Sequence, residues 1–154
     1  MCYNLLKGNI VKEFKDFLTS NKDYISELES KDRNPLVFAF VGDAVFSLFV
    51  RTYLADISTA KAGVLHGEAT KFVRASYQSM LLKALDDVLD ETEKRVVLTA
   101  RNTKTNNVAK HSNLEEYKQS TSFEALLGYL YLTHKNERLL EILEICKKYM
   151  GEQL

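Results

Sequence analysis

The spacing of hydrophobic residues is helical along most of this chain. In the stretch 9–18, Ile10, Phe14 and Phe17 recur every three or four residues, which places them on one face of a surface helix. Similar spacing predicts helices over 9–18, 23–31, 36–54, 58–73, 76–89, 91–102, 123–132 and 137–150. Residues 103–112 lack a hydrophobic period and are expected to form a loop.

Two of these predicted helices are apolar on nearly every face. The first, 36–54, follows Asn34 and Pro35, an N-cap residue and a proline at the first helical position. The second, 123–132, reads FEALLGYLYL. A helix that is hydrophobic all round belongs inside a domain, because only burial can cover every side of it. We therefore expect 36–54 to be the central helix of a single all-α domain.

Composition supports this architecture. The 154 residues contain six glycines and one proline, well below the average combined usage of about 12%. Chains rich in tight turns need those residues, so their scarcity favours helices joined by few loops. A chain of this length can bury one hydrophobic core.

Charge and cysteine content exclude several classes of protein. Lys and Arg together number 21, as do Asp and Glu, so the formal net charge is zero. This balance excludes a strongly cationic nucleic-acid binder but leaves room for a local basic patch. Cys2 and Cys146 lie at opposite ends without metal-binding spacing, which argues against a disulfide scaffold and a thiolate zinc site. Charges interrupt every apolar run short of a membrane span, and residues 1–9 lack the apolar core of a secretion signal, so we expect a soluble cytoplasmic protein.

Two carboxylates interrupt the apolar helices. Asp43 is the only charged residue within 36–50 and lies too deep in its helix to act as a cap. Glu124 is the only carboxylate within 119–134 and has apolar neighbours. An isolated buried carboxylate costs several kcal/mol unless it is paired, protonated or bound to a cation. Two such acids suggest a shared divalent metal held by oxygen ligands.

Each acid also has a purely structural explanation. Residues 121–124, TSFE, fit a capping box in which Thr121 caps a helix and Glu124 occupies its third position. Asp43 could be a buried aspartate satisfied by a distant partner. Gly42 and Gly128 lie near the acids, and each could admit a ligand, admit another helix or relieve packing.

Basic and amide side chains gather around the predicted loop without an intervening acid. They are Arg101, Asn102, Lys104, Lys110 and His111. A cationic loop suits phosphate contacts along an A-form RNA helix, although a merely solvated loop is the usual alternative. A second, weaker patch contains Lys71, Arg74 and Gln78, and it could equally be an ordinary exposed helix face. Metal-binding pairs of the Glu-x-x-His type and glycine-rich phosphate loops do not occur in the sequence.

Five segments together resemble the catalytic domain of the ribonuclease III family. They are NPL at 34–36, FVGDAVF at 40–46, LHGEATK at 65–71, RNTK at 101–104 and FEALLGYLYL at 123–132. The chain is most similar to the short form, Mini-ribonuclease III, which lacks the double-stranded-RNA-binding domain. On this resemblance, residues 34–154 form the catalytic domain and residues 1–33 an unmatched N-terminal helical segment.

The resemblance implies an activity and its site. It implies a homodimeric, all-helical endoribonuclease that cuts double-stranded RNA with Mg²⁺ and leaves 5′-phosphate and 3′-hydroxyl ends. It further implies maturation of the large-subunit (23S) ribosomal RNA precursor in the cytoplasm, with a large-subunit ribosomal protein as a candidate partner. By position, Asp43 would be the catalytic, metal-binding aspartate and Glu124 its metal-binding partner.

The sequence also departs from full-length ribonuclease III. Leu36, Ala39 and Thr121 stand where the longer enzymes carry further acids, which looks like the short form. In the basic loop, Asn106 and Ala109 appear in place of the family's glycine and proline. The site would therefore hold its cation with fewer carboxylates.

Two rival functions remain at this stage. One is a catalytically inactive ribonuclease III fold that acts as an RNA-binding or ribosome-associated module. Retention of both Asp43 and Glu124 argues against it, because an inactive domain has no reason to keep costly acids in apolar helices. The other is a helical adaptor whose apolar surface binds a partner, which predicts no dependence on Mg²⁺.

Overall fold

Helices make up every element in the part of the chain that the structure describes. The computed structural model describes residues 25–104 and 113–154. The helices are α2 (Glu27–Ser30), α3 (Pro35–Ile57), α4 (Ala62–Val73), α5 (Ala75–Leu85), α6 (Glu91–Asn102), α7 (Leu114–Leu132) and α8 (Asn136–Gly151). The all-α prediction is confirmed, whereas the predicted helix 9–18 lies outside the described residues.

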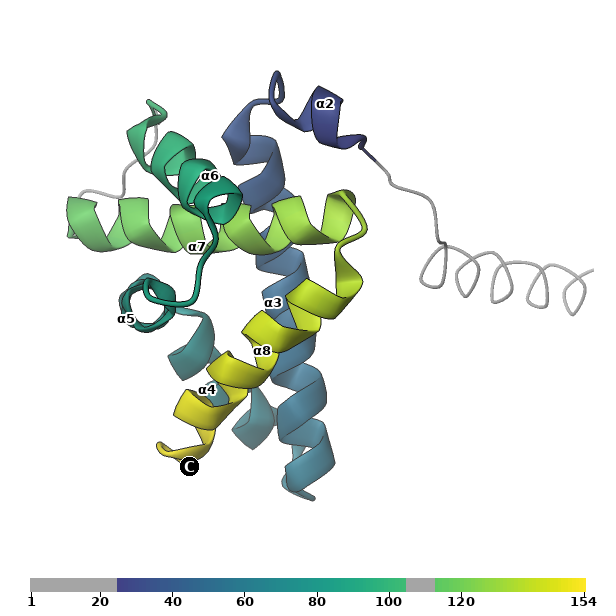
Figure 1. Cartoon of the computed structure of the whole chain (residues 1–154). Coiled ribbons are helices and arrows are strands. Elements are labelled where there is room, and N and C mark those ends of the chain that lie inside the picture. Colours follow the sequence, from purple (N-terminus) through teal and green to yellow (C-terminus); the bar gives the residue numbers. More distant parts are fainter. Residues whose placement is uncertain (1–24, 105–112) are drawn as a thin grey trace, which may run out of the picture.

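The apolar helix α3 and helix α7, which contains the apolar segment 123–132, cross at the centre of the fold (Figure 1). The Asn34 side chain accepts a hydrogen bond from the Leu36 amide at 3.0 Å, so α3 begins at Pro35 as the sequence predicted. Helix α7 packs most extensively against α3, and α5 and α6 also pack on α7. Helix α4 contacts α3, and α8 contacts α7 and α5.

The core lies where α3 and α7 face one another. Phe46 and Val50 of α3 and Phe123 of α7 have no exposed surface. The rings of Phe46 and Phe123 meet edge to face, with their centroids 4.9 Å apart. Such aromatic pairs add about 1 kcal/mol beyond the burial of their surface.

Two glycines bring the backbones of α3 and α7 into contact. A Cβ atom placed on Gly42 would lie 1.7 Å from the carbonyl oxygen of Glu124. A Cβ atom placed on Gly128 would lie 1.9 Å from the carbonyl oxygen of Phe38. No side chain fits at either position without separating the helices. The structure therefore explains Gly42 and Gly128 by the close approach of another helix.

Helix α7 begins nine residues earlier than the sequence pattern predicted. Its N-cap is Asn113, whose side chain accepts a hydrogen bond from the Glu115 amide at 3.1 Å. The stretch 114–122, which the pattern did not assign to a helix, is rich in Ser and Thr and therefore shows no hydrophobic periodicity. The Thr121 and Ser122 hydroxyls donate to backbone carbonyls four residues earlier, so these polar residues are satisfied within the helix.

Other helix boundaries differ by a few residues. Helix α4 begins at Ala62 after Lys61, not after a cap at Ser58 or Thr59. Helix α5 ends at Leu85, four residues before the predicted end. Ends of helices fray and are set by a few hydrogen bonds, so the hydrophobic pattern fixes them only loosely.

By length and composition, α3 could also cross a membrane. It is the one helix among the described residues with a sufficiently apolar window, of mean hydropathy 1.6. The side that faces α7 is packed as in the core of a helical domain, because Phe46 and Val50 are fully buried. Only 28% of that window is buried by this chain, however, so much of its apolar surface is uncovered.

Candidate active site

Asp43 and Glu124 come together at the crossing of α3 and α7. Asp43 directly follows Gly42, whose Cα faces the Glu124 backbone. The negative charge of Asp43 acts on the Glu124 carboxyl and raises its pKa. The sequence-based expectation that the two acids converge is therefore supported by the geometry, and the Gly42 contact is its cause.

Glu124 lies in the middle of α7, not at its start. Because α7 begins at Leu114, the capping-box explanation of Glu124 is wrong. The side chain is partly buried. Burial is the main reason that the pKa of Glu124 rises from 4.5 to about 7, and repulsion from Asp43 is the second. Near neutral pH this carboxyl is thus poised between its neutral and charged forms.

Asp43 is more exposed than the sequence indicated. Its apolar neighbours predicted a buried carboxylate, but the side chain is exposed in the single chain. The reason is that one side of α3 is left uncovered, so Phe40, three residues earlier, is 80% exposed. Asp43 therefore lies at the edge between the packed and the uncovered sides of α3, where it stays accessible.

The pair of acids fits a hard divalent cation. Neither Asp43 nor Glu124 forms an ion pair with a Lys or Arg of the described ranges. Two carboxylates that repel one another favour a shared cation, which replaces their repulsion by attraction. Carboxylate oxygens are also the ligands that Mg²⁺ prefers. No group of three or more His, Cys, Asp or Glu residues gathers in the described part of the chain, so these two acids would need substrate and water oxygens to complete the coordination.

Gln78 is a neighbour of the site that sequence reasoning misplaced. The sequence places it with Lys71 and Arg74 on an exposed helix face, but its side chain is only 1% exposed. The Gln78 amide instead faces Glu124, where it partly offsets the rise in the pKa of that carboxyl. Its Nε2 has no hydrogen-bond acceptor at bonding distance among the described residues. Lys71 and Arg74 are exposed as expected, and Lys71 pairs with Glu68 at 2.7 Å.

The basic residues after α6 are only partly described. Arg101 and Asn102 end α6, Lys104 follows it, and all three are exposed. Arg101 pairs at 2.6 Å with Glu115 at the start of α7, an acid that follows the basic residues in the sequence. Lys110 and His111 lie outside the described residues, as do Asn106 and Ala109.

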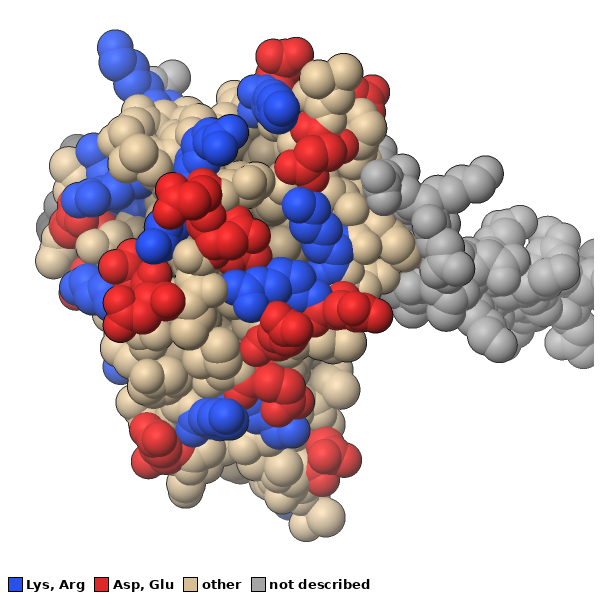
Figure 2. All heavy atoms as spheres, in the orientation of Figure 1, with Lys and Arg blue, Asp and Glu red and all other residues tan. Residues whose placement is uncertain are grey.

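The surface shows no large patch of one sign on the face seen in Figure 2. Acidic and basic side chains are interspersed over that face, in keeping with the formal net charge of zero. This face therefore offers no broad cationic surface.

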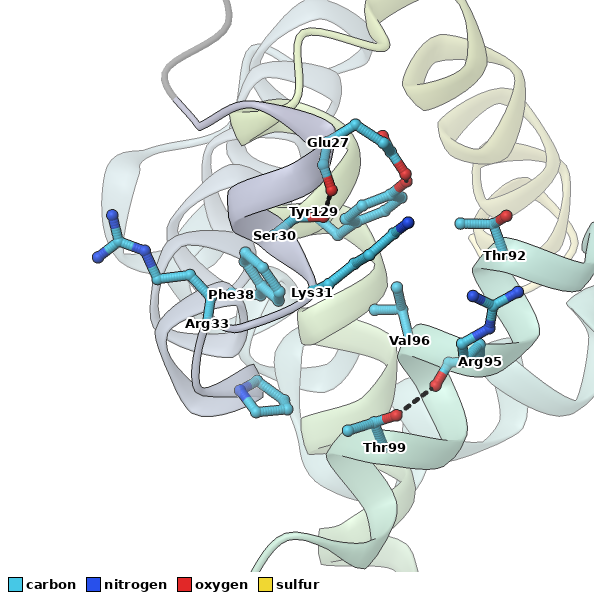
Figure 3. A pocket seen from close by; sticks show the side chains of 11 residues that line it. Glu27, Ser30, Lys31, Arg33, Phe38, Thr92, Arg95, Val96, Thr99 and Tyr129 are labelled. Carbon is cyan, nitrogen blue, oxygen red and sulfur yellow. Dashed lines mark hydrogen bonds between the residues drawn. The ribbon is translucent and has the colours of Figure 1, made fainter.

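A cavity of about 240 Å³ lies apart from the two acids, between α2, the start of α3, α6 and α7 (Figure 3). Its walls include Phe38, Val96 and Tyr129, with Lys31 and Arg95 on opposite sides. The Tyr129 hydroxyl donates a hydrogen bond of 2.5 Å to a Glu27 carboxylate oxygen. That carboxylate also pairs with Lys135 at 3.1 Å, so α2 is held onto the end of α7. Asp43 and Glu124 do not line the cavity.

Comparisons with known proteins identify the family of this chain. The Ribonuclease III domain family matches residues 36–135. A Mini-ribonuclease 3 of Thermoanaerobacter sp. is 43% identical over 119 residues, which cover 77% of this chain and 84% of that protein. A Mini-ribonuclease 3 of Enterococcus faecalis is 39% identical over 124 residues, covering 79% of this chain and 94% of that protein.

A solved structure has the same fold. The crystal structure of a Fusobacterium nucleatum protein superposes with a TM-score of 0.70 at 34% sequence identity. The match covers 79% of this chain and 95% of the other. The matched family region contains both Asp43 and Glu124. The chain therefore belongs to the ribonuclease III family of endoribonucleases and, within it, is similar along most of its length to the Mini-ribonuclease 3 proteins.

Proposed function

We propose that this chain is a divalent-cation-dependent endoribonuclease that cuts double-stranded RNA, with Mg²⁺ as the physiological ion. The observation that carries the proposal is the meeting of Asp43 and Glu124 at the α3–α7 crossing, in a chain of the ribonuclease III family. Enzymes of this family typically use a divalent metal, and the donor set here suits one.

In this proposal the chain's own residues hold and orient the reacting groups. Asp43, which is exposed, would contact the cation from the substrate side, and Glu124 would contact it from the core. A bound Mg²⁺ would supply Lewis-acid stabilisation of the charge that develops on the phosphate. Glu124 must lose its proton to act as a ligand, so the pKa of about 7 makes ligation sensitive to pH near neutrality.

Cleavage of a defined duplex tests this function. We expect wild-type protein with Mg²⁺ to leave 5′-phosphate and 3′-hydroxyl ends, and Asp43→Asn to lower the rate by at least about a hundredfold, as loss of an electrostatic catalytic group does. Asp56→Asn is the matched control, because Asp56 is an exposed acid on the same helix. If the Asp43→Asn variant cuts as fast as the Asp56→Asn variant, the proposed catalytic role of Asp43 is wrong. Asp43→Asn that binds duplex RNA as wild type does, together with a wild type that fails to cut, would favour the inactive RNA-binding module.

We further propose that the active form is a homodimer formed through the uncovered side of α3. Val37, Phe40 and Leu48 are 39%, 80% and 63% exposed and lie along that side. Exposed apolar surface of this kind marks an interface, and a second copy would bury it next to Asp43. Light scattering of the purified protein measures the mass, and a monomer at micromolar concentration contradicts the proposal.

RNA contact is proposed for the basic residues around the end of α6 and on α4. Arg101, Asn102 and Lys104 are exposed there, as are Lys71 and Arg74. Because the net charge is zero, we expect few phosphate contacts per chain and a steep loss of affinity with salt. Lys104→Ala should reduce the salt slope by about one, whereas Lys148→Ala on α8 should leave it unchanged. Equal slopes for the two variants would remove Lys104 from the interface.

The substrate proposed is the large-subunit (23S) ribosomal RNA precursor, matured in the cytoplasm. The support is the likeness to the Mini-ribonuclease 3 proteins over most of their length. Incubation with a precursor duplex, with and without a large-subunit ribosomal protein, followed by mapping of the ends, tests both the substrate and that partner. Random cleavage sites in the precursor would contradict this assignment.

A further inference from the structure

Gln78 is a buried polar residue next to the proposed site whose bonding is incomplete. It lies on α5, and its side chain is 1% exposed. Its Nε2 has no hydrogen-bond partner among the described residues. An unpaired buried N–H group is costly, so an amide kept in such a place calls for an explanation.

The position of the Gln78 amide supplies an explanation. The Gln78 side-chain amide lies next to the carboxyl of Glu124. Helix α5 packs firmly against α7, which holds Gln78 beside that carboxyl.

We propose that Gln78 is a positioning residue for Glu124. Its Nε2–H donates a hydrogen bond to one carboxylate oxygen of Glu124 when a cation is bound, which leaves the other oxygen directed at the ion. The free amide is thus a donor held ready for the ionised carboxylate. This inference rests on the proposed function in assuming that Glu124 ligates a divalent cation.

Binding of Mn²⁺ to the full chain, followed by electron paramagnetic resonance, tests the role without relying on activity. Gln78→Met keeps the size of the side chain and removes the donor. We expect it to weaken Mn²⁺ binding about tenfold, the loss of one hydrogen bond to a charged group. Gln78→Asn keeps a carboxamide on a shorter side chain and should weaken Mn²⁺ binding by a smaller factor.

Ser79→Ala is the matched control. Ser79 is the next residue on α5, is 2% exposed and donates to the Gln119 side-chain oxygen and not to Asp43 or Glu124. We expect this variant to lose stability in thermal unfolding while keeping wild-type affinity for Mn²⁺. If Gln78→Met binds Mn²⁺ as tightly as wild type, or if Ser79→Ala weakens binding equally, the positioning role is overturned.

Kinetics on duplex RNA separate this role from the RNA contact that the sequence suggested for Gln78. Positioning of Glu124 predicts that Gln78→Met lowers kcat about tenfold with little change in KM for RNA. A raised KM with unchanged kcat and unchanged Mn²⁺ affinity would show RNA contact instead and refute positioning. Should the wild type fail to cut any duplex, the proposed function fails, while the Mn²⁺ comparison still decides the part played by Gln78.

Discussion

The two sides of α3 have the same apolar character and very different surroundings. On the side that faces α7, Phe46 and Val50 have no exposed surface, and Gly42 brings the backbones into contact. On the other side, Phe40 is 80% exposed and Leu48 is 63% exposed. The comparison teaches that an apolar sequence does not by itself tell which side of a helix its own chain buries, and the proposed dimer would bury the other side.

The largest effect that distinguishes the two sides is expected from the phenylalanines. Phe46→Ala should lower the free energy of unfolding by about 3–5 kcal/mol, because it leaves a cavity in the core. Phe40→Ala should cost less than about 1 kcal/mol within the subunit and act mainly by weakening the dimer. Denaturant unfolding at several protein concentrations measures both effects.

A matched charge substitution sharpens this test. Phe40→Asp should yield a folded monomer by light scattering, whereas Leu140→Asp on α8, where the leucine is 62% exposed, should leave the mass unchanged. Equal behaviour of these two variants would mean that the uncovered side of α3 is ordinary surface.

The next effect concerns the glycine contact. Gly42→Ala should destabilise the fold by about 3 kcal/mol, because its methyl group would meet the Glu124 carbonyl and push α3 away from α7. Gly67→Ala on α4 is the control, since nothing lies within 4 Å of a Cβ atom there. It should stabilise the protein by up to about 1 kcal/mol as a better helix former. A tolerated Gly42→Ala would contradict the close crossing.

The smallest effect follows from the ionisation of Glu124. With a pKa near 7, a cation must displace its proton at lower pH, so cation affinity should fall about tenfold for each pH unit below 7. In metal-free protein the free energy of unfolding should decrease as the pH rises from 4.5 toward 7. The reason is that Glu124 holds its proton more tightly in the folded state than in the unfolded state.

Carbon NMR of the Glu124 carboxyl can separate the two causes of this shift. In Asp43→Asn the pKa of Glu124 should fall below about 7, since the repulsion is gone, but stay above 4.5, since burial remains. A pKa of Glu124 that is the same in wild type and in this variant would place the two carboxyls too far apart to share an ion.

The sequence predicted the central part of the fold better than the surroundings of the site. The Asn34–Pro35 start and the apolar run after it predicted α3. The two acids within apolar helices, Asp43 and Glu124, predicted one shared site. The start of α7 was missed because Ser and Thr residues that bond to their own helix carry no hydrophobic period. The hydrophobic pattern detects helical segments whose apolar residues recur on one face. It does not detect segments whose polar side chains form hydrogen bonds within their own helix.

Long-range neighbours were beyond the reach of pattern. Gln78 was assigned to a surface patch by its spacing from Lys71 and Arg74, yet the packing of α5 on α7 buries it beside Glu124. The exposure of Asp43 was likewise missed, because sequence shows the apolar neighbours but not which side of α3 the chain leaves uncovered. Both errors concern tertiary contacts, which no single helix determines.

A double-mutant cycle on Mn²⁺ affinity tests most directly the claim that Asp43 and Glu124 act on one ion. Titration calorimetry would compare wild type, Asp43→Asn, Glu124→Gln and the double variant, with Asp56→Asn as control. If one ion is shared, each single variant should lose at least about tenfold in affinity, and the double variant little more than the weaker-binding single variant. Losses that multiply in the double variant, or wild-type affinity in either single variant, would contradict the shared site.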